Sequence, residues 1–181
     1  MRFVETHLSG AYIIDPVVHR DNRGFFLESH SKKVFDNTGI SITFVQDNHS
    51  LSHQAGVLRG LHFQYPPHVQ SKLIRVIKGS VYDVIVDMRN NSPTYKKWFS
   101  VELSGDNFKM LFVPAGFAHG FCTLENDTEV IYKVDTLYAP QSDGGIRWDD
   151  PDLKISWPVK NPIVSEKDKK LPFLRDIENP F

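Results

Sequence analysis

Short runs of alternating apolar and polar residues follow one another along most of the chain, and Gly, Pro, Asn or Asp ends nearly every run. Alternation with a period of two, rich in β-branched and aromatic residues, is typical of antiparallel strands. The pattern predicts strands at residues 11–14, 24–29, 42–50, 57–63, 72–78, 81–88, 98–103, 108–113, 119–124 and 128–136. So many strands in a chain of this length predict an all-β sandwich or closed barrel.

Helical signals are few. Ser-led stretches predict two short peripheral helices, at residues 31–36 and 164–170. Gly79 separates two alternating runs and predicts a tight hairpin between them. From Lys154 onward the chain lacks periodicity, so we expect an irregular segment that packs on the barrel.

Composition limits the class of protein. The chain has 181 residues, 40% of them hydrophobic and 24% charged, so we expect one folded domain spanning residues 1–181. A formal net charge of −1 supplies no broad basic surface for nucleic acid, and no apolar run is long enough to cross a membrane. Cys122 is the one cysteine, and the polar first residues do not resemble a secretory signal, so we expect a cytoplasmic protein.

Three ionisable side chains share a strand face with apolar residues. Because alternate side chains of a strand point to the same face, Lys72, Asp83 and Tyr132 are predicted to point into the barrel. Burying an unpaired Lys or Asp is strongly destabilising, so these residues need a partner or a function. A structural Lys72–Asp83 ion pair stays open as one interpretation, and ordinary core packing of Tyr132 as another.

Arg59 and His62 fall on opposite faces of a regular strand. Gly60 lies between them, and glycine is a natural position for a β-bulge. A bulge there would bring both side chains to one face. We therefore expect Arg59 and His62 to point into the barrel together.

Residues 112–119 read FVPAGFAH and have the Pro-x-Gly-x-x-His spacing of the second cupin motif, in which a turn delivers a His into a small barrel. Metal-binding cupins add a His-x-His pair, but the corresponding stretch here is His62-Phe63-Gln64. His62 and His119 beside Lys72 make a poor metal site, since an ammonium competes with the metal. We therefore expect no bound metal.

Without a metal, a His, a Lys and a Tyr in one barrel suit proton abstraction next to a carbonyl. An imidazole such as that of His62 removes protons near neutral pH. The Lys72 ammonium can stabilise the enolate oxygen, and the Tyr132 phenol can return a proton. A base and an acid on opposite faces of one carbon invert that carbon.

Motifs along the whole chain carry a resemblance to a known family. They are DNRGFFLE (21–28), VQDNHS (45–50), LRGLHFQ (58–64), QSKLIRV (70–76), GSVYDV (79–84), FVPAGFAHGF (112–121), YKV (132–134) and GIRWDDP (145–151). In this order they closely resemble the dTDP-4-dehydrorhamnose 3,5-epimerases, from about Leu8 to the C-terminus. The resemblance implies a cupin-type antiparallel jelly-roll barrel that uses no metal or cofactor.

The resemblance also implies an activity and a set of catalytic residues. The family inverts C3 and C5 of dTDP-4-dehydro-6-deoxy-D-glucose in dTDP-L-rhamnose biosynthesis. By resemblance, His62 is the base, Asp168 orients it, Tyr132 is the acid and Lys72 stabilises the enolate at C4. From the residues alone, Asp168 would be interpreted as part of a helix start, because Ser165 precedes it by three residues.

Further residues fall where the family contacts its substrate, and the resemblance implies homodimers that exchange N-terminal strands. The sugar and pyrophosphate would be contacted by Arg59 and His119, with Asp83 holding the hydrogen bonds of the site. The nucleotide would be contacted by Gln46, Asn48, Arg23 and Glu28, the last two across the dimer. Phe26 and Tyr138 are candidates to stack on thymine, and Asp143 and Lys167 complete the expected binding set.

Three other functions stay open at this point. A sister epimerase acting at C3 or C5 alone would keep the same His, Lys and Tyr. A cupin that binds a nucleotide sugar without turnover would be favoured by loss of His62 or by Phe in place of Tyr132, and neither is seen. A metal-dependent cupin dioxygenase is disfavoured by Phe63-Gln64.

Overall fold

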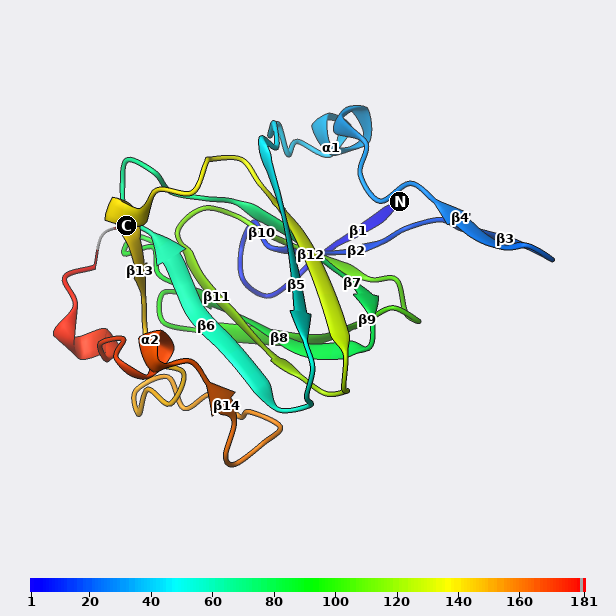
Figure 1. The fold of residues 1–181 in the computed structure, drawn as a ribbon. Coiled ribbons are helices and arrows are strands. Elements are labelled where there is room, and N and C mark those ends of the chain that lie inside the picture. The colour runs from blue at the N-terminus through cyan, green and yellow to red at the C-terminus, as the bar shows by residue number, and fades with distance from the viewer. Residues whose placement is uncertain (180) are drawn as a thin grey trace.

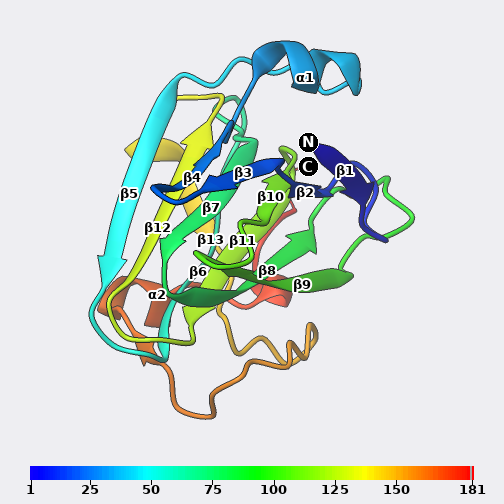
Figure 2. The same cartoon turned by 90° about the vertical axis from the view of Figure 1, so that its right-hand side faces the viewer.

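The computed structural model describes residues 1–179 and 181, and it is built mainly of two facing six-stranded assemblies (Figures 1 and 2). The first sheet has the order β1 (Arg2–Glu5), β2 (Tyr12–Asp15), β10 (Met110–Val113), β7 (Lys72–Lys78), β12 (Thr128–Val134) and β5 (Gln46–Ser52). The second has β13 (Asp143–Gly145), β6 (Val57–Gln64), β11 (Phe117–Thr123), β8 (Ser80–Asp87) and β9 (Trp98–Ser104), and β14 (Ile163–Val164) pairs with β6. All pairs except β14–β6 are antiparallel, which confirms the all-β expectation.

A short hairpin of β3 (Val18–Asp21) and β4 (Gly24–Leu27) lies outside both sheets and projects from the body of the molecule (Figure 1). The predicted helices are present as α1 (Lys32–Asn37) and α2 (Glu166–Lys169), with 3₁₀ turns η1 (Pro140–Ser142) and η2 (Leu174–Asp176). Among the described residues, no helix is long and apolar enough to cross a membrane.

The core has three layers because both sheets are covered on the outside. Between the sheets, Ile74 and Val76 of β7 pack with Val81 and Ile85 of β8. Outside the second sheet, the irregular C-terminal segment buries β8 through Leu153 and its neighbours, as expected. Outside the first sheet, α1 and the segment after it form the third layer.

The hairpin predicted at Gly79 is wrong. β7 and β8 belong to different sheets, so Gly79 carries the chain from one sheet to the other, and its carbonyl accepts the Gly105 N–H at 3.0 Å. Gly79 has a φ of +73°, and a side chain there would collide with Thr128. A tight turn is needed for a hairpin and for a crossing alike, which is why local sequence could not distinguish them.

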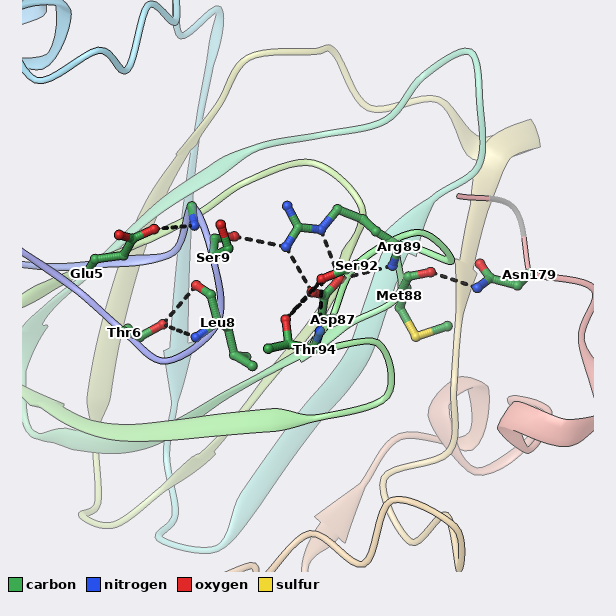
Figure 3. Close-up of polar contacts among 11 residues, drawn as sticks. Glu5, Thr6, Leu8, Ser9, Asp87, Met88, Arg89, Ser92, Thr94 and Asn179 are labelled. Atoms are coloured by element: carbon green, nitrogen blue, oxygen red, sulfur yellow. Dashed lines mark hydrogen bonds and ion pairs between the residues drawn. The ribbon is translucent and has the colours of Figure 1, made fainter.

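A cluster of hydrogen bonds at the end of β8 fastens the surrounding loops (Figure 3). The buried Asp87 carboxylate accepts from Arg89 Nε at 2.9 Å, Ser92 Oγ at 2.5 Å and Thr94 Oγ1 at 2.7 Å. Arg89 also donates to the Ser9 carbonyl at 2.9 Å. Burial would raise the pKa of Asp87, but these hydrogen bonds lower it to about 2. The cluster therefore joins an N-terminal loop to the β8–β9 connection.

Candidate active site

Two adjoining hollows open between the sheets, with volumes of about 530 and 230 Å³. They share His62, Lys72, Tyr132 and Lys167. The larger is lined also by Arg59, His119 and Asp168, and the smaller by Gln46, Asn48, Gln64, Gln70, Tyr138 and Asp143. The structure thus gathers most of the predicted site residues in one place.

The Gly60 bulge brings Arg59 and His62 to the cavity together, as expected. Across β6 and β11, His62 pairs with His119 but Arg59 pairs with Phe121, so the register shifts by one residue between them. A Cβ at Gly60 would lie 2.5 Å from the Cα of Gly120, so no larger residue fits there. Both side chains line the larger hollow.

His62 is held by the carboxylate of Asp168. The distance from His62 Nε2 to Asp168 Oδ1 is 2.8 Å, and the other oxygen accepts the Gly60 N–H at 3.2 Å. Burial would raise the pKa of Asp168, but the hydrogen bonds from His62 and Gly60 hold it below its ordinary value. An ionised carboxylate only accepts hydrogen bonds, so Nε2 carries the hydrogen and Nδ1 keeps a lone pair for a substrate proton.

The predicted helix start at Asp168 is present, but it involves only the backbone N–H of Asp168. Ser165 Oγ accepts the Asp168 N–H at 3.1 Å and so caps α2. The Asp168 side chain turns away from the helix and reaches His62 on β6, which lies 106 residues earlier in the chain. One residue therefore both completes a cap and orients the imidazole.

Lys72 begins β7 and is buried inside the cavity. Burial lowers the pKa of its ammonium to about 8, and the carboxylates of Asp83 and Asp143 limit that fall. Its Nζ lies 3.5 Å from the carbonyl oxygen of His62. Among the described residues, Lys72 makes no direct ion pair with Asp83, so the purely structural Lys72–Asp83 pair is wrong.

Asp83 instead pairs with His119 inside the barrel. The His119 Nε2 atom lies 2.9 and 3.0 Å from the two carboxylate oxygens of Asp83, and both residues are buried. His119 stands directly opposite His62 on the neighbouring strand. Two imidazoles, each tied to a carboxylate, therefore face one cavity.

Tyr132 comes from the opposite sheet. It lies on β12 of the first sheet and packs against the inner core, whereas His62 lies on β6 of the second sheet. Burial raises the pKa of the Tyr132 phenol, and the Arg59 charge opposes that rise. The phenol is therefore protonated near neutral pH, when it can act as an acid.

The mouth of the smaller hollow is framed by a chain of hydrogen bonds. Gln46 donates to Asn48 Oδ1 at 2.8 Å and accepts the Tyr138 N–H at 3.0 Å. The Tyr138 hydroxyl donates to Asp143 Oδ2 at 3.1 Å, and Lys167 forms an ion pair with the same carboxylate. This ion pair raises the pKa of Lys167. These five predicted residues thus lie together beside His62.

Three predicted residues lie apart from the cavity within one chain. Arg23 and Phe26 are on the projecting hairpin, and Glu28 follows it. Arg23 pairs with Asp21 at 2.6 Å, and Phe26 is 67% exposed. They line separate shallow hollows on and beside the hairpin. None of the three lines either of the two hollows that hold His62.

Sequence reasoning missed Gln64 and Gln70, which line the smaller hollow. Gln64 has the same strand parity as His62, so the alternation rule could have found it. Gln70 lies in a loop and carries no such signal. In the described part of the chain, no group of three or more His, Cys, Asp or Glu side chains is arranged to hold a metal ion.

Comparison with known proteins gives a consistent set of relatives. The family model for dTDP-4-dehydrorhamnose 3,5-epimerase matches residues 5–176. The enzyme of that name from Methanothermobacter thermautotrophicus is 50% identical over 99% of this chain and 96% of its own length. The crystal structure of the Bacillus anthracis enzyme with TDP and PPi bound is 51% identical, with a TM-score of 0.94, and the match covers 96% of this chain and 99% of that one.

A structure from Legionella pneumophila, of an epimerase in complex with dTDP-4-keto-L-rhamnose, is 42% identical with a TM-score of 0.93. That match covers 98% of this chain and 94% of the other. Such similarity over the whole length extends to the arrangement of the strands, so the expected cupin-type jelly roll is confirmed.

Proposed function

The chain belongs to the dTDP-4-dehydrorhamnose 3,5-epimerase family, and from that premise we propose that it converts dTDP-4-dehydro-6-deoxy-D-glucose to dTDP-4-dehydro-L-rhamnose in dTDP-L-rhamnose biosynthesis. The reaction is an isomerisation that inverts C3 and C5. The observation that carries the mechanism is the His62–Asp168 contact of 2.8 Å inside a cavity that also holds Lys72 and Tyr132.

His62 acts as the base. Its Nε2 is occupied by Asp168, so Nδ1 removes the substrate proton and the resulting imidazolium is stabilised by the carboxylate. C3 and C5 both flank the C4 ketone, so loss of either proton gives an enolate on the same oxygen. One base and one enolate site can therefore serve both carbons in turn.

Lys72 stabilises the enolate, and Tyr132 returns the proton. A buried ammonium aimed at a developing negative oxygen lowers the barrier because no solvent needs to reorganise. Tyr132 and His62 come from opposite sheets, so a sugar ring between them has the base on one side and the acid on the other. Removal from one face and return to the other inverts the carbon.

The remaining cavity residues bind the rest of the substrate. Arg59 and His119 contact the sugar and pyrophosphate, with Asp83 fixing His119. Gln46, Asn48, Tyr138, Asp143 and Lys167 form the nucleotide side of the cavity. The chain as a whole has a net charge of −1 and offers no general attraction to anions. The pyrophosphate must therefore be bound by local cations of the cavity, such as Arg59 and Lys72.

We propose further that two chains form a homodimer by exchanging N-terminal strands, and that Arg23, Phe26 and Glu28 reach the nucleotide of the partner's cavity. The hairpin that projects from the body of the molecule (Figure 1) supports this arrangement, as does the exposure of its Phe25 and Phe26. Mixing inactive Arg23→Ala and His62→Ala chains would then restore activity, because one of the two sites regains a complete set. Recovery of no activity from mixed dimers would contradict shared sites.

We also assign the enzyme to the cytoplasm, where nucleotide sugars are made and where the single thiol of Cys122 stays reduced. Fractionation of cells that carry the tagged protein tests this assignment. Recovery with periplasmic or secreted markers would overturn it.

Isotope exchange tests the reaction directly. Incubation of the keto sugar with the enzyme in deuterated water is expected to place deuterium at both C3 and C5, as read by NMR. Label at one carbon alone would make the protein a single-site epimerase, and binding without any label would make it a nucleotide-sugar-binding cupin. EDTA should leave the rate unchanged, because Gln64 and Lys72 stand where a metal would need ligands.

A further inference from the structure

Gln64 is the last residue of β6 and lies two residues beyond His62 on the same side of the strand. It is buried, with 3% of its surface exposed. Its position corresponds to the second His of the His-x-His pair of metal-binding cupins. Here the side chain is an amide, which can donate two hydrogen bonds and accept others at the same time.

Each polar atom of Gln64 is bonded to the backbone of a neighbouring loop. Nε2 donates to the His68 carbonyl at 2.6 Å and to the Leu137 carbonyl at 3.3 Å. Oε1 accepts the Ala139 N–H at 2.8 Å. Gln64 therefore ties the β6–β7 connection to the segment that follows β12.

The last two of these bonds bracket Tyr138. Gln64 holds the carbonyl just before Tyr138 and the N–H just after it. Tyr138 itself donates its own N–H to Gln46 and its hydroxyl to Asp143. The buried Gln64 thus fixes the backbone on both sides of Tyr138, and Asp143 fixes its hydroxyl.

Hydrophobic burial contributes little to this segment. Leu137 is 63% exposed and Tyr138 is 53% exposed, and only the small Ala139 that follows them is buried. A segment with few apolar contacts keeps one conformation only if hydrogen bonds hold it. Gln64 supplies these bonds from a rigid strand.

We propose that Gln64 is a positioning residue that holds residues 137–139 so that Tyr138 stands ready at the nucleotide side of the cavity. The segment is then ordered before the substrate arrives, so binding does not have to order it. The proposed chemical step uses His62, Lys72 and Tyr132, and the hydrogen bonds of the Gln64 side chain go to other residues. This inference rests on the proposed function where it is tested by KM and kcat. The affinity for dTDP gives a second test that does not require turnover.

Replacing Gln64 by Met keeps the volume of the side chain and removes its hydrogen bonds. We expect Gln64→Met to weaken dTDP binding, measured by calorimetry, and to raise KM by about tenfold, with kcat changed less than about threefold. Gln64→Glu keeps the acceptor for Ala139 but turns a carboxylate toward two carbonyls, and it should act in the same direction. If Gln64→Met does not fold, dTDP binding and KM can be measured on Gln64→Glu instead.

Thr128→Val is the matched control. Thr128 is fully buried and donates to the Glu125 carbonyl at 2.8 Å, in the turn between β11 and β12. Its loss should lower the melting temperature without changing the dTDP affinity or KM. An equal rise in KM for Thr128→Val would show that the effect of Gln64 is a general loss of stability.

A double-mutant cycle with Tyr138→Ala decides whether Gln64 acts through Tyr138. If it does, Gln64→Met combined with Tyr138→Ala should bind dTDP no more weakly than Tyr138→Ala alone, because the residue being positioned is already gone. Effects that multiply, or an affinity of Gln64→Met equal to that of the unmutated protein, would overturn the inference. Failure of the unmutated protein to convert the keto sugar would refute the proposed function, while the dTDP affinities would still test Gln64.

Discussion

Two buried carboxylates in this molecule have opposite uses. Asp87 accepts hydrogen bonds from Arg89, Ser92 and Thr94, which lie two to seven residues away in the chain. Asp168 accepts one from His62, 106 residues away. Both have pKa values below the ordinary range, since hydrogen bonds to the charged form outweigh burial at each.

The two carboxylates differ in whether a hydrogen-bond partner keeps a free atom that can bind another group. The partners of Asp87 are donors within one loop, so the cluster is closed and holds the β8–β9 connection in place (Figure 3). The partner of Asp168 is an imidazole with a second nitrogen, and that nitrogen remains available to a substrate. Asp87 thus fixes a loop whose donors are all used, whereas Asp168 holds a group that can still take up a proton, as the proposed function requires.

The largest expected effect comes from removing the imidazole. His62→Ala should lower deuterium exchange at both C3 and C5 by about 10³-fold or more, because no other group replaces the base. Asp168→Asn, which keeps the shape but not the charge, should lower kcat by about 100-fold. NMR of the labelled sugar measures both, and a normal melting temperature confirms folding. Near-normal exchange by His62→Ala would mean that another residue is the base.

Tyr132→Phe should separate the two halves of the reaction. The base is intact, so exchange of the substrate proton should fall by about tenfold at most, whereas formation of the inverted product should fall by about 100-fold. The ratio of exchange to product formation, followed by NMR in one sample, gives the result. Equal losses in both would argue against Tyr132 as the acid.

At the other carboxylate, the effect should be on stability alone. Asp87→Asn should lower the free energy of unfolding by about 2 kcal/mol, because the half-buried Arg89 guanidinium loses its charge partner. Urea unfolding measures this loss, and kcat should be unchanged. The folded pKa of about 2 lies below the ordinary value of 3.8, so the Asp87 contribution is present above about pH 4 and disappears as the pH falls toward 2. A variant with the acid sensitivity of the unmutated protein would contradict this assignment.

The smallest effect concerns the pH dependence set by Lys72. Its pKa of about 8 predicts that kcat/KM falls as the pH rises through 8, by about tenfold per pH unit once the ammonium is lost. Lys72→Arg, which stays charged, should show a lower rate without that fall. A rate that stays flat to pH 9.5 in the unmutated protein would show that the Lys72 charge is not required.

The strand pattern predicted much of this site. Alternation alone placed Lys72, Asp83 and Tyr132 inside the barrel, and the predicted strand at 72–78 coincides with β7. The Gly60 bulge was also predictable, because only glycine tolerates so close an approach of two strands. These features depend on residues a few positions apart, and the period of a strand fixes the side to which each points.

Only the tertiary structure decided which strands pair and which buried polar side chains contact one another. Local sequence favoured a hairpin at Gly79, where the chain changes sheets, and a Lys72–Asp83 pair, where Asp83 takes His119. It correctly indicated a helix start at Asp168, but it gave no sign that the Asp168 carboxylate also binds His62. The amino-acid sequence determines which side chains must leave solvent, because hydrophobic periodicity is local. Which buried groups meet depends on how the two sheets are stacked, and contacts across about a hundred residues leave no local signal.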